Sequence, residues 1–178
     1  MMKTLLISML CAALVVPAVS AAEEGKKTRI RSYLYSTDYD NLMLKIRSQR
    51  FEEALPELKR FAYYGEKHPQ YLLGMMMISG EAGVPVNVEE GLSWMRLSLE
   101  QRNKDWEKSY KQVTSNLSEA QLASLEPIYQ KLKGKYGVDV QNMHCGIERM
   151  RSSNLKIHIC RKNILQQEYY EVTEYTQE

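Results

Sequence analysis

The chain of 178 residues carries 24 lysines and arginines against 22 aspartates and glutamates, which leaves a formal charge of +2 at neutral pH. This balance gives no net field that would recruit nucleic acid or a membrane surface, so charge favours neither class of partner. The length fits one domain of ordinary size that can bury a hydrophobic core.

Residues 1–21 have the layout of a secretory signal peptide. One lysine precedes an apolar run over residues 5–16, and this run is too short to span a bilayer. Small side chains stand three positions and one position before a cut after Ala21. We therefore expect a periplasmic protein with a mature chain of about 157 residues and a formal charge of +1.

Two cysteines, Cys145 and Cys160, remain after this cut. In an oxidising compartment, paired thiols close to a disulfide. A hairpin that turns about Ser152 and Ser153 places the two cysteines opposite each other, as a cross-strand bridge requires. We therefore predict a disulfide-bridged hairpin over residues 137–165.

The same segment offers an alternative, a zinc site made from His144, Cys145, His158 and Cys160. Adjacent residues of a strand point to opposite faces, so His144 faces away from Cys145, whereas His158 can share a face with Cys160. Because only three of the four ligands converge, the disulfide is the favoured interpretation.

Residues 37–136 carry helical patterns throughout. Residues 51–62 place apolar side chains at one-, three- and four-residue steps, which is the stripe of an amphipathic helix. Asn87 followed by Glu90 is the signature of a helix N-cap with a capping box, and residues 118–121 repeat it with serine and glutamine. Helix pairs are therefore expected to follow one another along the chain.

One helix pattern also recurs at a fixed offset. Residues 51–62 superpose on residues 88–99 at an offset of 37 positions, which aligns a Glu-Glu pair and a following leucine. Between these stretches another helix is expected to open near Pro69 and to end at Gly80 in a left-handed cap. Such repetition is typical of stacked helix pairs.

The stretch over residues 70–99 resembles a Sel1-like repeat. The family pattern combines a leucine-glycine step, a glycine turn followed by valine, a helix cap and a later tryptophan. By this resemblance, Gly74 is expected to let Trp94 or its neighbour approach the first helix closely. Met77 stands where the family has an aromatic residue, Asn87 replaces the usual acid, and one extra residue lies between the turn glycines. The matching residues are Leu73, Gly74, Gly80, Gly83, Val84 and Trp94.

The resemblance implies an all-α fold, a short α-solenoid of Sel1-like helix pairs that ends in the small disulfide-linked β-hairpin. We expect an N-terminal extension over residues 22–36, helical repeats over 37–136, the hairpin over 137–165 and an acidic tail over 166–178. The glycines of the repeat are expected to serve helix packing and the turn between paired helices, not to cradle a ligand.

Sel1-like proteins are typically adaptors, so the resemblance implies a non-catalytic scaffold that binds other envelope proteins. We expect the partner to bind the first helix of the repeat, where Leu72, Met75 and Met76 fall off the core side and would form an exposed apolar patch. The competing interpretation is that a neighbouring element covers these residues and makes them core.

We predict no catalytic residues, no metal and no cofactor, because the sequence has neither a nucleophile elbow nor an H-E-x-x-H motif. The alternative function is an envelope enzyme or binding protein related to the cysteine-rich Sel1-like proteins that bind or hydrolyse β-lactams. This chain lacks their regular cysteine pair in each repeat. A deep pocket lined by ionisable groups would favour that alternative, and a shallow apolar groove would favour a protein partner.

Overall fold

The computed structural model describes residues 24–150 and 154–176. The helices are α1 (Ser32–Arg47), α2 (Phe51–Tyr63), α3 (Lys67–Ser79), α4 (Val88–Ser98), α5 (Lys104–Thr114), α6 (Glu119–Ser124) and α7 (Glu126–Tyr136). The strands are β1 (Lys26–Arg31), β2 (Met143–Arg149), β3 (Lys156–Lys162), β4 (Ile164–Leu165) and β5 (Tyr169–Glu174). Short 3-10 turns are η1 (Glu81–Gly83), η2 (Leu99–Gln101) and η3 (Gln166–Glu168). Over these two described ranges, no helix is long and apolar enough to cross a membrane.

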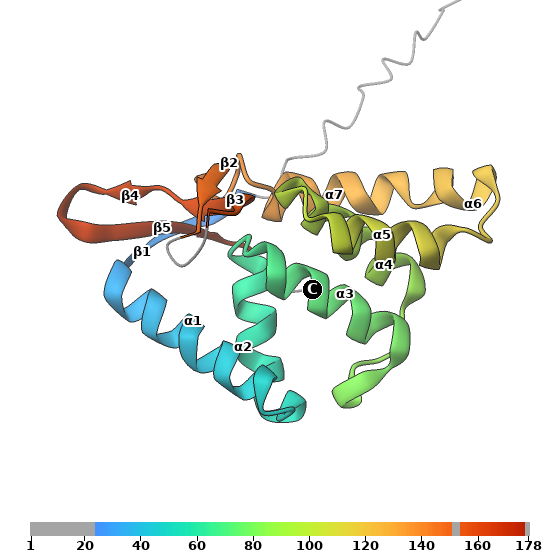
Figure 1. The fold of residues 1–178 in the computed structure, drawn as a ribbon, viewed down its shortest axis with the longest axis horizontal. Coiled ribbons are helices and arrows are strands. Elements are labelled where there is room, and N and C mark those ends of the chain that lie inside the picture. Colours follow the sequence, from blue (N-terminus) through green and yellow to red (C-terminus); the bar gives the residue numbers. More distant parts are fainter. Residues whose placement is uncertain (1–23, 151–153, 177–178) are drawn as a thin grey trace, which may run out of the picture.

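The strands form two antiparallel sheets. β5 lies between β1 and β4 in one sheet, and β2 pairs with β3 in a separate hairpin. The three-stranded sheet lies at the end of the molecule that holds α1, and α6 lies at the opposite end (Figure 1). The predicted all-α class, with its short solenoid, is therefore wrong.

The reason is a pairing between the two ends of the chain. The basic strand β1 lies antiparallel to the acidic strand β5, with Lys27 Nζ 3.1 Å from Glu171 Oε1, and Thr28 Oγ1 donates to Glu174 at 2.9 Å. On the core side of β5, Val172 is fully buried. A charged run at a chain end, taken alone, is typical of a solvated terminus. The sequence near each run does not indicate the pairing, because the partner strand lies at the other end of the chain.

Two hydrophobic clusters form the core. The first joins α1, α2 and α3 to β5 through Tyr35, Leu42, Met43, Ala54, Leu58, Phe61, Tyr64, Met76, Val84 and Val172. The second packs α7 against α2, α3 and α4 through Ala62, Leu73, Trp94, Leu97, Leu132 and Tyr136. Because α7 packs against α4 in this cluster, the helix pair α3–α4 buries an apolar side within the same chain.

The helices α3 and α4 approach each other at two glycines. A Cβ on Gly74 would lie 2.6 Å from Gly91 O and 2.8 Å from Met95 N, and a Cβ on Gly91 would lie 2.8 Å from Gly74 O. The expectation that Gly74 admits Trp94 or its neighbour is confirmed, and the neighbour is Met95. Close backbone approach is the physical reason for glycine at this position.

The turn between α3 and α4 also follows the sequence prediction. Gly80 and Gly83 adopt left-handed backbone with φ of 74° and 73°, and Gly80 caps α3. The Asn87 side chain accepts from Glu90 N at 3.1 Å, so the predicted N-cap of α4 is present. The reciprocal bond of the predicted capping box is not formed, because Asn87 N donates to Met77 O at 2.9 Å. These glycines reverse the chain.

Two other helix starts were predicted from local signatures. Ser118 and Gln121 form the expected capping box at the start of α6. The helix α3 begins at Lys67, two residues before Pro69 where the prediction placed its first turn. The capping box thus located the start of α6, and the proline signal placed the start of α3 two residues late.

The predicted disulfide is confirmed. Cys145 and Cys160 are bonded, and they stand directly opposite each other in the register of β2 and β3 with Cα atoms 3.9 Å apart. Cys160 is buried, so this face of the hairpin lies against the body of the protein. The turn predicted at Ser152 and Ser153 lies outside the described residues.

Replacing Gly74 with alanine should lower the free energy of unfolding by about 1–3 kcal/mol, because the added Cβ would collide with the backbone of α4. Denaturant unfolding followed by circular dichroism measures the change. The matched control is Gly134→Ala in α7, where nothing lies within 4 Å of the added Cβ. Helix propensity should make that control about 0.5–1 kcal/mol more stable. Equal effects at the two glycines would contradict the packing role.

Removing the disulfide by Cys145→Ala and Cys160→Ala should lower the free energy of unfolding by about 3 kcal/mol, because the link spans 15 positions and restricts the unfolded chain. Mass spectrometry of the exported, non-reduced protein should first show two hydrogens missing. Two free thiols in that sample would refute the bridge.

Candidate functional site

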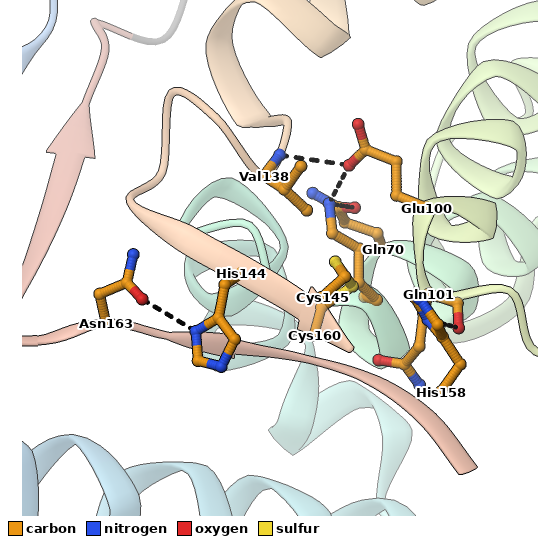
Figure 2. The surroundings of a disulfide bond; sticks show 10 residues. Gln70, Glu100, Gln101, Val138, His144, Cys145, His158, Cys160 and Asn163 are labelled. Carbon is orange, nitrogen blue, oxygen red and sulfur yellow. Dashed lines mark hydrogen bonds and ion pairs between the residues drawn. A yellow bond between two sulfur atoms is a disulfide. The ribbon is translucent and has the colours of Figure 1, made fainter. Parts of the chain in front are cut away.

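A buried ion pair fixes the elements around the candidate site. Lys67, in the first turn of α3, donates to Gln70 Oε1 at 2.9 Å and to Glu100 Oε2 at 2.7 Å. The same oxygen of Glu100 accepts from Val138 N at 3.2 Å, as Figure 2 shows. Burial lowers the pKa of Lys67, and the nearby carboxylate of Glu100 opposes that shift. The pair joins α3 and η2 to the segment that follows α7.

Gln141 ties the same segment to the sheet. Its Nε2 donates to Lys135 O at 2.9 Å and to Thr173 O at 2.8 Å, and its Oε1 accepts from Thr173 N at 3.1 Å. The backbone oxygen of Gln141 accepts from Lys162 Nζ at 2.8 Å. Since Gln141 is fully buried, these bonds set how α7, β3 and β5 sit around it.

A cavity of about 550 Å³ opens between the helices and the strand β3. We call it the α1–β3 cavity. The helices α1, α3 and α5 contribute to one part of its wall, and β3 and β5 contribute to the rest. Its aromatic and ionisable lining side chains include Tyr35, Tyr39, Glu66, Trp106, Lys162 and Tyr170.

Glu66 brings a carboxylate into this cavity from the position just before α3. Its Oε1 accepts a hydrogen bond from Tyr35 OH at 2.7 Å. Burial raises the pKa of Glu66 above the ordinary range of a glutamate, while the bond from Tyr35 and the charge of Lys162 act in the opposite direction. The carboxyl group is therefore held where ionisation is costly.

Lys162 brings the opposite charge from the last position of β3. The residue is 5% exposed, and burial lowers the pKa of Lys162 to about 8, with the charge of Glu66 opposing the shift. Titratable groups whose pKa values are shifted by burial inside a cavity are candidates for a functional site.

A second feature borders the cavity. We call it the α3–α5 aromatic face, and it consists of His68, Tyr71, Met75 and Trp106. Trp106 stacks on Tyr71 with ring centroids 5.0 Å apart and on His68 with centroids 5.6 Å apart. Met75 follows Tyr71 by four positions, so both lie on the same side of α3. All four side chains are half-buried, which leaves rings and a thioether partly accessible.

The three predicted partner-binding residues do not form one exposed patch. Met76 is 3% exposed and belongs to the first core cluster, and Leu72 packs against that cluster. The expectation of an exposed apolar patch is therefore corrected, because the first core cluster, which also holds residues of α1 and α2, takes up two of the three side chains. Met75 is half-buried and contributes to the aromatic face instead.

Of the residues matched to the repeat, Leu73, Val84 and Trp94 lie in the core, Gly74 lies at the contact with α4, and the turn glycines Gly80 and Gly83 lie nearer the surface. Leu73 is fully buried, Trp94 is 1% exposed and Val84 is 4% exposed. The indole nitrogen of Trp94 donates to Glu90 Oε1 at 3.2 Å. These side chains hold α3, η1 and α4 together and do not line the α1–β3 cavity.

The donor set of the alternative zinc site is not formed. Both cysteine sulfurs are in the disulfide, and the two histidines lie on either side of it (Figure 2). His144 Nδ1 is 2.8 Å from Asn163 Oδ1, and His158 Nδ1 is 2.9 Å from Gln101 O. Across the parts of the chain that the structure describes, no cluster of three or more histidine, cysteine or acidic side chains could hold a metal ion.

Sequence reasoning missed Glu66, Trp106 and Lys162 as site residues. Lys162 stands two positions after Cys160, so strand periodicity alone would have placed both on the face that meets the body. Glu66 has no comparable local signal, since its partner Tyr35 lies 31 positions earlier in the chain.

Comparison with protein-family models, with curated proteins and with solved structures found no match to this chain.

The partly desolvated carboxyl of the half-buried Glu66 predicts a pH-dependent stability. A pKa raised in the folded state means that the folded protein keeps this proton to higher pH than the unfolded chain. The stabilising contribution is complete below the unfolded pKa and is lost as pH rises through the folded pKa. Glu66→Gln keeps an acceptor for Tyr35 but cannot ionise, so its stability should fall less as the pH rises from about 4.3, the pKa of free glutamate, toward neutral pH.

Unfolding midpoints measured across that pH range compare the two proteins. Glu168→Gln is the matched control, because this side chain is exposed, and it should leave the pH profile unchanged. Parallel profiles for the natural protein and Glu66→Gln would show that ionisation of Glu66 does not destabilise the fold.

Proposed function

We propose that this chain is a non-catalytic protein-binding adaptor of the bacterial envelope. The observation that carries the proposal is the α3–α5 aromatic face, where Tyr71 and Trp106 stack yet remain half-exposed. Tryptophan and tyrosine dominate binding energy at protein interfaces, because rigid rings bury a large area with little loss of conformational entropy. Met75 beside them adds a flexible apolar side chain that adapts to a partner.

A relationship to Sel1-like repeats is part of the proposal. It rests on the helix pair α3–α4, with buried Leu73 and Trp94, the left-handed cap at Gly80 and the close approach at Gly74. The aromatic face lies on α3, the first helix of this pair, and on α5.

Export to the periplasm is also proposed. Disulfides persist in oxidising compartments, so the Cys145–Cys160 bond is compatible with an exported protein. The signal peptide predicted over residues 1–21 lies outside the described residues, and its support is the sequence pattern alone.

The function is tested by partner recovery and affinity. Mature protein with a photo-crosslinker on α5 is used to recover a partner from envelope extracts, and the affinity of that purified partner is then measured. Trp106→Ala should weaken binding by about 2 kcal/mol, or roughly 30-fold, because it removes the central ring of the stack. The helix α5 has no fully buried residue, so the melting temperature should change little.

Met75→Lys is a second variant that introduces a charge into the same face and should weaken binding without touching Trp106. The matched control is Tyr33→Ala, an aromatic residue on α1 that is 60% exposed and outside the face. Undiminished affinity in both Trp106→Ala and Met75→Lys, with folding intact, would refute this interface.

A further inference from the structure

Two opposite charges in the α1–β3 cavity have only neutral partners. The carboxylate of Glu66 accepts from Tyr35 OH at 2.7 Å, and the ammonium of Lys162 donates to Gln141 O at 2.8 Å. Counting residues 24–150 and 154–176, neither side chain forms an ion pair. An ammonium has three donors and a carboxylate has about four acceptor positions, so each group retains unused hydrogen-bonding capacity.

Burial makes both charges costly. It raises the pKa of Glu66 and lowers the pKa of Lys162 to about 8, and each group only partly relieves the other. A ligand cation close to Glu66 and a ligand anion close to Lys162 would therefore stabilise both ionised forms. Groups of opposite sign that share one cavity favour a ligand that itself carries both signs.

The other charged residues that the structure describes near the cavity do not pair with Glu66 or Lys162 in place of a ligand. Arg161 also lines the wall, but its Nε lies 2.9 Å from each carboxylate oxygen of Glu148. Asp40 lines the α1 side of the wall and adds a further negative charge. Lys67, the residue after Glu66, is already paired with Glu100.

The rest of the wall supplies apolar surface. Tyr35 packs edge-on against Tyr170 with ring centroids 5.1 Å apart, and Tyr39 and Trp106 line the same cavity. A volume of about 550 Å³ lies within the range of small-molecule sites. The aromatic side chains offer contact for one apolar side chain, and the polar groups of the wall, such as Ser36 and Gln101, surround them.

We propose that the α1–β3 cavity binds a zwitterion of the free amino acid class, with its carboxylate on Lys162, its ammonium on Glu66 and an apolar side chain against the aromatic wall. The same chemistry is carried by a short unblocked peptide, which is the second source to be distinguished. This inference goes beyond the adaptor function and does not depend on it.

Titration calorimetry on the mature protein tests the site with L-phenylalanine, N-acetylphenylalanine, phenethylamine and glycylphenylalanine. The acetylated compound lacks the cation and phenethylamine lacks the anion. Each should bind at least about 10-fold more weakly than phenylalanine, because one buried charge stays unpaired. Tighter binding of phenylalanine identifies a free amino acid, and tighter binding of glycylphenylalanine identifies a short peptide.

Two variants assign the charges. Glu66→Gln should weaken phenylalanine at least about 10-fold yet leave N-acetylphenylalanine unchanged, and Lys162→Met should weaken phenylalanine yet leave phenethylamine unchanged. Exposed residues provide the controls Glu168→Gln and Lys156→Met, which should bind like the natural protein.

Near-ultraviolet circular dichroism verifies that each variant is folded. If Lys162→Met does not fold, the comparison between Glu66→Gln and the natural protein still tests the proposal. Absence of saturable binding for both phenylalanine and glycylphenylalanine would overturn the proposal. Equal affinity for the blocked and unblocked compounds would overturn it as well. Recovery of a protein partner by the aromatic face is unaffected by either result, so this test and the test of the adaptor function fail separately.

Discussion

The buried ion pair between Lys67 and Glu100 is the interaction on which the arrangement of the helices and strands depends. The Lys67 side chain has no exposed surface, and the Glu100 carboxylate beside it also accepts from the backbone of Val138. A buried pair of this kind adds little net stability over apolar residues, but losing one partner costs about 3–5 kcal/mol because the other charge stays buried. The pair therefore fixes geometry more than it adds stability.

That geometry places the two candidate binding features side by side. Lys67 follows Glu66 directly, and the segment held by Glu100 and Gln141 leads into the hairpin that carries Lys162. The disulfide holds β2 and β3 in register, and Glu66 and Lys162 therefore sit on separately anchored elements. The aromatic face begins at His68, one position beyond the same ion pair.

Local chemistry made part of this fold predictable. The glycine turn after α3, the Asn87 cap and the pairing of Cys145 with Cys160 each follow from residues close in sequence or from strand register. The sheet between the chain ends and the burial of Met76 did not follow, because both depend on partners far away in the chain. Glu66 was missed for the same reason, whereas the inward position of Lys162 follows from its spacing to Cys160.

The central claim is that Lys67 and Glu100 act as one unit that positions the cavity walls. A double-mutant cycle of Lys67→Met and Glu100→Leu, measured by denaturant unfolding, tests it most directly. Glu100→Leu alone should cost about 3–5 kcal/mol, and adding Lys67→Met should restore most of that loss because no charge is left buried. Single costs that simply add in the double variant would contradict the account.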